Sequence, residues 1–196
     1  MPFPPPLTLI IKCHWLISYV QLLSNCPNIG EEGFVALGTH CTALRDLQLE
    51  DCPGVTDGML KAIAQHNSVI RSLRMSPASA YLDSMGIARV TDEGIGAFVL
   101  ARKDLLKRIS LTEGVTDRGV RLVVENCPRL KQLGMWSSLI TDEGCQPIMQ
   151  LRFLRKLEIG PSMTRKLHPS PQDRLHEGLT IFLKFPWILF TSSSAH

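Results

Sequence analysis

Residues 114–128 read GVTDRGVRLVVENCP, and the first part of this stretch occurs again along the chain. The related phrases are GVTDGML from Gly54, RVTDEGI from Arg89, LITDEGC from Leu139 and, more weakly, NIGEEGF from Asn28. The apolar residue at the second position of each phrase returns at intervals of 26, 35, 25 and 25 residues. A period of this size predicts stacked supersecondary units rather than one globular core.

Each phrase belongs to a unit that can be interpreted physically. An apolar pattern, L-x-x-L-x-L, precedes it, and the last three positions alternate as in a strand. Val120, Val123 and Val124 then share one face of a helix. Thr-Asp is a start signal for that helix, since short oxygen-bearing side chains accept hydrogen bonds from first-turn amides, and Pro128 cannot continue it. The apolar triplets are Leu44, Leu47, Leu49; Ile70, Leu73, Met75; Leu106, Ile109, Leu111; Leu130, Leu133, Met135; and Leu154, Leu157, Ile159.

The best unit, Cys41–His66, resembles a leucine-rich repeat of the cysteine-containing subtype. The residues that carry the resemblance are Cys41, Leu44, Leu47, Leu49, Cys52, Val55-Thr56-Asp57 and Ile63-Ala64. Three units depart from the pattern, because Asn67, Lys103 and Phe153 stand where the leading Cys is expected. The resemblance implies an α/β fold, a leucine-rich-repeat solenoid with a parallel sheet on its concave face and helices on its convex face.

The repeats cover residues 26–160 and leave a segment at each end. Residues 1–25 are apolar and are interpreted as a degenerate repeat or a cap. Lys12 and His14 argue against a membrane span, and no basic region precedes the apolar run to suggest a signal peptide. Residues 161–196 are interpreted as a linker and an irregular apolar tail. Solenoids usually end in polar caps, whereas both end segments here are apolar and irregular. We therefore hypothesise that this sequence is a fragment, or an aberrant gene model, of a longer repeat array.

The net charge of +3 does not lie in the repeats. Residues 26–160 hold 16 Lys and Arg against 16 Asp and Glu, so the excess belongs to the two end segments. A nucleic-acid-binding protein is expected to show a basic stripe on its folded part. We therefore expect no nucleic-acid partner.

The six cysteines suit a reducing compartment. Four of them, Cys26, Cys41, Cys52 and Cys127, occupy repeat positions as small buried hydrophobes. The chain has no C-x-x-C pair and no zinc-finger spacing. We expect reduced thiols, no metal, no cofactor, and a location in the cytoplasm or the nucleus.

The polar residues give no enzyme signature. Three acidic pairs, including Asp92-Glu93, stand at predicted helix starts, where negative charge is favourable. His40 and His66 lie at predicted helix ends, where a cation is favoured for the same reason. The chain has no G-x-S-x-G motif and no glycine-rich phosphate loop. We expect a protein that is not an enzyme.

The resemblance also implies a function, since cysteine-containing repeats are most familiar in F-box/LRR proteins. These are substrate receptors of SCF ubiquitin ligase complexes, which act in ubiquitin-dependent protein degradation. No F-box is seen in this chain, so a protein-binding repeat module for substrate recognition is the expectation. The alternatives are a stand-alone scaffold and a GTPase-activating regulator, for which Arg89 is the one candidate finger residue.

Partner contacts are expected where strand residues alternate with the buried triplets and point outward. These positions are Asp46, Gln48, Glu50; Ser72, Arg74, Ser76; Arg108, Ser110, Thr112; Gln132, Gly134, Trp136; and Lys156, Glu158, Gly160. The insertion after Met75 and the indole of Trp136 leave the predicted sheet on one rim, so they can meet one partner. In the alternative, Trp136 packs over its own shortened loop. The predicted partner-binding residues are Arg74, Tyr81, Arg108, Gln132 and Trp136.

Overall fold

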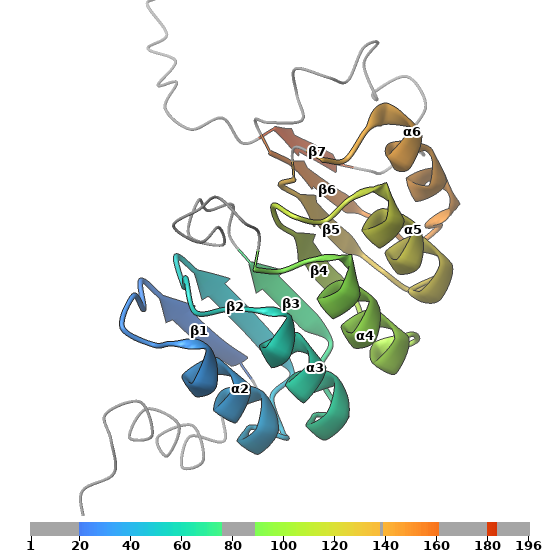
Figure 1. Cartoon of the computed structure of the whole chain (residues 1–196). Coiled ribbons are helices and arrows are strands. Elements are labelled where there is room, and N and C mark those ends of the chain that lie inside the picture. The colour runs from blue at the N-terminus through green and yellow to red at the C-terminus, as the bar shows by residue number, and fades with distance from the viewer. Residues whose placement is uncertain (1–19, 76–88, 138, 161–179, 184–196) are drawn as a thin grey trace, which may run out of the picture.

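The computed structural model describes residues 20–75, 89–137, 139–160 and 180–183. In these ranges one parallel sheet of seven strands runs in chain order, with helices along one of its faces (Figure 1). The strands are β1 Val20–Ser24, β2 Asp46–Glu50, β3 Ser72–Met75, β4 Arg108–Leu111, β5 Gln132–Met135, β6 Lys156–Ile159 and β7 Thr180–Leu183. The helices are α2 Glu31–His40, α3 Asp57–His66, α4 Asp92–Arg102, α5 Asp117–Asn126, α6 Asp142–Cys145 and the 3-10 helix η2 Gln146–Gln150.

The apolar triplets form the core between the sheet and the helices. The middle residue of each triplet pairs with the middle residue of the next, so that Leu73 faces Leu47 and Leu133 faces Ile109. Each of these four side chains is at most 1% exposed. The predicted strand register is therefore confirmed, and the chain folds as an α/β solenoid of the leucine-rich-repeat type.

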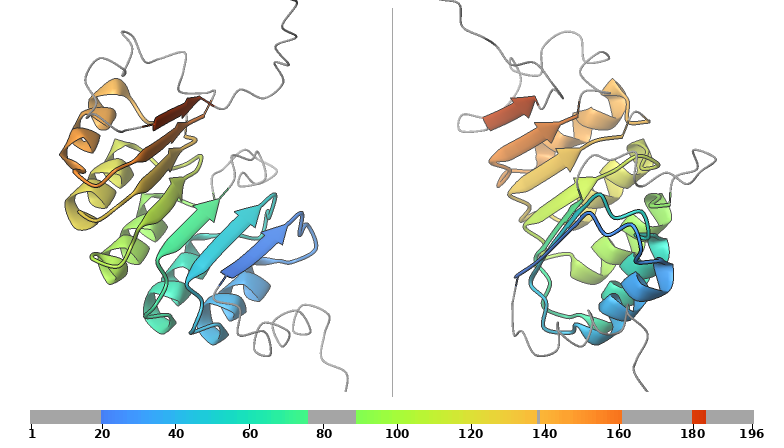
Figure 2. Two further views of the ribbon diagram at one scale, coloured as in Figure 1. Left: turned by 180° about the vertical axis from the view of Figure 1, so that it is seen from behind. Right: turned by 90° about the vertical axis from the view of Figure 1, so that its left-hand side faces the viewer.

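Two strands lie outside the predicted repeat region of residues 26–160. Strand β1 pairs in parallel with β2, where buried Leu23 faces Leu49. Strand β7 pairs in the same direction with β6. Figure 2 shows the two strands at opposite ends of the sheet. In the described part of the chain, no helix is long and apolar enough to cross a lipid bilayer.

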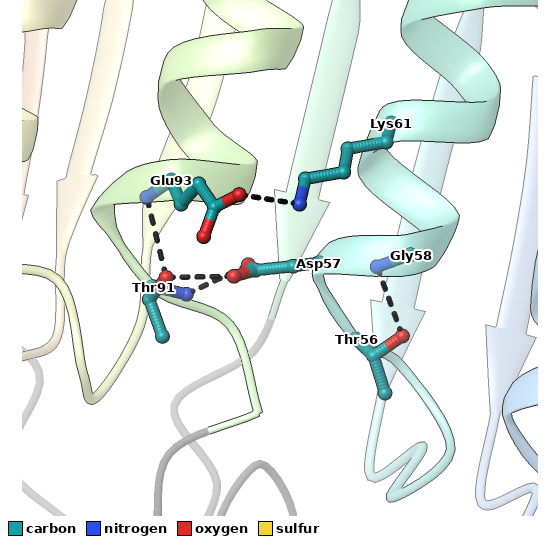
Figure 3. Close-up of polar contacts among 6 residues, drawn as sticks. All are labelled: Thr56, Asp57, Gly58, Lys61, Thr91 and Glu93. Atoms are coloured by element: carbon teal, nitrogen blue, oxygen red, sulfur yellow. Dashed lines mark hydrogen bonds and ion pairs between the residues drawn. The ribbon is translucent and has the colours of Figure 1, made fainter.

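Thr-Asp has two separate roles in the structure. The Thr caps the helix as predicted: the Thr56 hydroxyl accepts a hydrogen bond from Gly58 N at 3.2 Å. The Asp reaches the next repeat, where Asp57 accepts bonds from Thr91 N at 2.9 Å and from Thr91 Oγ1 at 2.6 Å (Figure 3). The expectation that the acidic residues serve their own helix was therefore incomplete, because this carboxylate joins two repeats.

The same bond pair joins the following repeats. Asp92 accepts from Thr116 N and Oγ1 at 2.9 and 2.6 Å, and Asp117 accepts from Thr141 N and Oγ1, both at 2.7 Å. The first helix has no Thr cap, yet its Glu31 accepts a bond from the Thr56 hydroxyl at 2.8 Å. The weak copy of the phrase thus keeps a carboxylate for the neighbouring repeat.

The glycine that follows Thr-Asp in three repeats makes room for this contact. A Cβ on Gly119 would stand 2.5 Å from Oδ1 of Asp92, and a Cβ on Gly94 or Gly144 would overlap the preceding repeat's carboxylate. Any side chain at these positions would displace the aspartate. The motif T-D-x-G therefore encodes contact between repeats as well as a helix start.

Candidate protein-binding surface

The sheet face that carries no helices, here called the open face, bears a hydrogen-bonded network. Arg108 on β4 donates from Nε to the Ser72 hydroxyl on β3 at 3.0 Å and pairs with the Asp46 carboxylate on β2. Arg74 donates to the Gln48 side chain across the β2–β3 pair. Because each bond crosses strands, the network holds these side chains in fixed positions on the open face.

Several open-face positions are buried, so their predicted exposure is wrong. Ser72, Ser110, Thr112 and Trp136 are 1–5% exposed, and Gly134 and Gly160 are buried as well. Side chains from neighbouring strands cover them, as Arg108 covers Ser72. The alternation correctly predicted which side chains lie on the open face. It did not predict that side chains from neighbouring strands would bury some of them.

Trp136 is the clearest case. A Cβ on Gly134 would stand 3.0 Å from the indole Nε1, and a Cβ on Gly160 would stand 2.8 Å from Cε3 of the ring. The two glycines thus make space for the indole, and Trp136 N donates to Leu111 O at 2.8 Å. With 4% of its surface exposed, the ring has little area left for a partner, which favours a packing role, with Gly134 and Gly160 as neighbours that the loop alternative did not foresee.

The other predicted partner-binding residues fall into two groups. Arg74 is exposed on β3, whereas Arg108 and Gln132 are half-buried and face each other on β4 and β5. Tyr81, together with Ser76 and most of the insertion, lies outside the described residues. The open face therefore keeps Arg74, Arg108 and Gln132 as accessible candidates.

The structure reveals a row of cationic side chains that the charge count missed. Each stands one residue before a strand, from β2 to β6, and each is exposed. Backbone bonds tie the row together, since each of its last four members donates its amide to the carbonyl of the preceding member at 2.7–2.9 Å. The members of this basic row are Arg45, Arg71, Lys107, Lys131 and Arg155.

The basic row lines an open groove of about 530 Å³ together with Asp46, Arg108 and Gln132. Six of the eight lining residues are cationic and one is acidic. The expectation that the folded part has no basic stripe is therefore wrong, because a total of charges does not show where they lie. The available signal was the Arg or Lys after the first Leu or Ile of L-x-x-L-x-L in all five units.

The cysteines in the described part of the chain pack as apolar side chains. Burial raises the pKa of the Cys127 and Cys145 thiols to about 12 and that of Cys52 to about 11. Cys26 and Cys41 are half-buried against the core. Within the described ranges, no group of three or more His, Cys, Asp or Glu side chains could hold a metal ion.

Comparison with known proteins supports the fold. No protein-family model and no curated protein matches this sequence. The structure is similar to the crystal structure of the Rad7 and Elc1 complex in yeast, with a TM-score of 0.52 and 19% sequence identity. The match covers 90% of this chain and 54% of that chain, so this chain spans about half the length of its neighbour. At this identity the likeness is one of fold alone.

Proposed function

We propose that this chain is a protein-binding module that holds its partner on the open face and along the basic groove. The observation that carries the proposal is the groove, because the residue before each of five successive strands is an exposed cation that lines it. Stacked repeats use such extended surfaces to bind other proteins. Arg74, Arg108 and Gln132 add polar groups on the adjoining face.

The finer part of the proposal is substrate recognition in SCF-type ubiquitin ligation. It is supported by the resemblance to cysteine-containing repeats, and the structural neighbour was itself solved as a complex of two proteins. Attachment to a ligase rests on the repeat subtype, since no F-box is seen in this chain. We place the protein in the cytoplasm or the nucleus, where buried reduced thiols are ordinary.

Proximity labelling in cells tests both parts of this proposal. The labelled proteins are compared for the wild type, for Gln48→Ala/Arg74→Ala on the open face, and for the matched control Arg118→Ala/Arg121→Ala on α5. We expect specific proteins, ligase subunits among them, to be lost with the open-face variant and kept with the control. The same labelled set in all three would contradict binding through the open face.

We further propose that the chain acts by binding and not by catalysis. The GTPase-activating alternative needs an accessible arginine, and Arg89 is half-buried beside the start of α4, where its carbonyl accepts a bond from Asp57 N at 3.0 Å. Purified protein is expected to leave the hydrolysis rate of a panel of small GTPases unchanged. A stimulated rate that Arg89→Ala abolishes would establish the alternative.

A further inference from the structure

We propose that the basic row binds a short acidic segment of the partner protein in an extended conformation. This inference rests on the proposed function and adds the chemistry of the partner. The row supplies five of the six positive charges that line the groove, and one of its members stands before each strand from β2 to β6.

The charge of the repeats is separated in space. The groove holds six cationic side chains and one carboxylate, Asp46, which is already paired with Arg108. Residues 26–160 hold 16 cationic and 16 acidic residues, so the remainder of the repeats has ten against fifteen. The groove therefore has a surplus of five positive charges, whereas the rest of residues 26–160 is net negative. Such a groove attracts a compact anionic group.

The dimensions of the row suit an extended peptide. Parallel strands lie about 4.8 Å apart, so five residues that directly precede adjacent strands span roughly 19 Å. An extended chain advances about 3.4 Å per residue, and about six residues therefore cover the row. Helices α4 and α5 follow the carboxyl ends of the strands (Figure 1), and their acidic first residues, Asp92 and Asp117, so lie at the rim opposite the row.

One observation favours an acidic peptide over nucleic acid. The groove is lined by Arg, Lys, Asp and Gln and by no aromatic side chain, whereas binding of single strands relies on bases stacking on aromatic rings.

Fluorescence anisotropy with labelled hexaglutamate tests the inference on the full chain. Hexaglutamine is the control peptide. The variant Lys107→Gln/Lys131→Gln removes two charges from the centre of the row, and Arg118→Gln/Arg121→Gln removes two from α5. All four side chains are exposed, and thermal melting checks that the variants fold.

We expect hexaglutamate to bind and hexaglutamine not to bind. The Kd for hexaglutamate should rise roughly tenfold in the groove variant and less than about threefold in the α5 variant, as for loss of direct charge contacts. Raising the salt from about 50 to about 300 mM should weaken binding, because exposed charges are screened.

Three results would overturn the inference. If the groove variant and the α5 variant bind hexaglutamate with equal affinity, the basic row is not the binding site. Tighter binding of a 5′-phosphorylated hexathymidylate, weakened by the groove variant, would make nucleic acid the ligand. Self-association that the groove variant abolishes, seen by sedimentation, would make the acidic rim of a second copy the occupant. If partners are still lost with Gln48→Ala/Arg74→Ala in cells, the proposed function stands and only its chemistry is wrong.

Discussion

At the scale of single residues, the Thr-Asp phrase recurs because its two side chains make hydrogen bonds to two different parts of the structure. The Thr hydroxyl caps its own helix, and the Asp carboxylate accepts two bonds from the Thr of the next repeat. A capping role alone allows Ser, Thr, Asp or Asn at the start of a helix. The bridging role explains why the chain repeats the pair and why glycine follows it.

Removing one bridging carboxylate should destabilise the protein more than removing an acidic residue that only faces a helix start. We expect Asp92→Ala to cost about 1–3 kcal/mol, since it leaves Thr116 N and its hydroxyl without their acceptor. Glu32→Ala removes an exposed first-turn acid and is the control, with an expected cost of about 0.3–1 kcal/mol or less. Urea unfolding measures both, and equal losses would show that the bridge contributes nothing.

The glycine of the motif gives a second residue-scale prediction. Gly119→Ala places a Cβ in overlap with the Val115 side chain and 2.5 Å from the Asp92 carboxylate, and it should cost about 1–3 kcal/mol. Gly96→Ala in α4 is the control, because its Cβ meets only the end of Leu122 at 3.2 Å while Ala favours the helix by about 0.5–1 kcal/mol. If Gly119→Ala and Gly96→Ala show the same melting temperature, the steric explanation is wrong.

At the scale of elements, the return from helix to strand is held in different ways in different units. Asn67 stands where Cys41 and Cys127 stand, and its amide donates to Cys41 O and Leu44 O, both at 2.9 Å. Its carbonyl oxygen accepts from Val69 N and Ile70 N at 3.0 and 2.9 Å. The departure from the repeat pattern is therefore a polar substitute that fastens α3 to the following strand.

Restoring the repeat residue at this position should weaken the protein. Asn67→Cys is expected to cost about 1–3 kcal/mol, because it leaves buried backbone groups without hydrogen-bond partners. Denaturant unfolding of the variant against the wild type measures the loss. If Asn67→Cys is more stable than the wild type, the cysteine of the repeat pattern stabilises this position more than the hydrogen bonds of Asn67 do.

The strands themselves depend on the alternation of buried and open positions. Leu133 is fully buried in β5, so Leu133→Ala should cost about 2–5 kcal/mol. Gln48→Ala on the open face of β2 should change stability by about 0.5 kcal/mol or less. Equal losses in urea unfolding would refute the register.

At the scale of the whole molecule, features set by local sequence were predictable, and features set by distant contacts were not. The period, the apolar triplets and the Thr caps each depend on residues within one unit. The bridge from Asp92 joins residues 24 positions apart, and the indole of Trp136 fits between Gly134 and Gly160 on neighbouring strands. The basic row was missed because its members are spaced along the chain and come together only when the strands align.

The central claim is that the open face binds a partner protein without contributing much to stability. Calorimetry with the purified partner found by proximity labelling tests it most directly, using the wild type, Gln48→Ala/Arg74→Ala, and the control Arg118→Ala/Arg121→Ala. The account predicts a Kd that rises roughly tenfold for the open-face variant alone, with melting temperatures unchanged in all three. Equal affinity of all three proteins for the partner would contradict it.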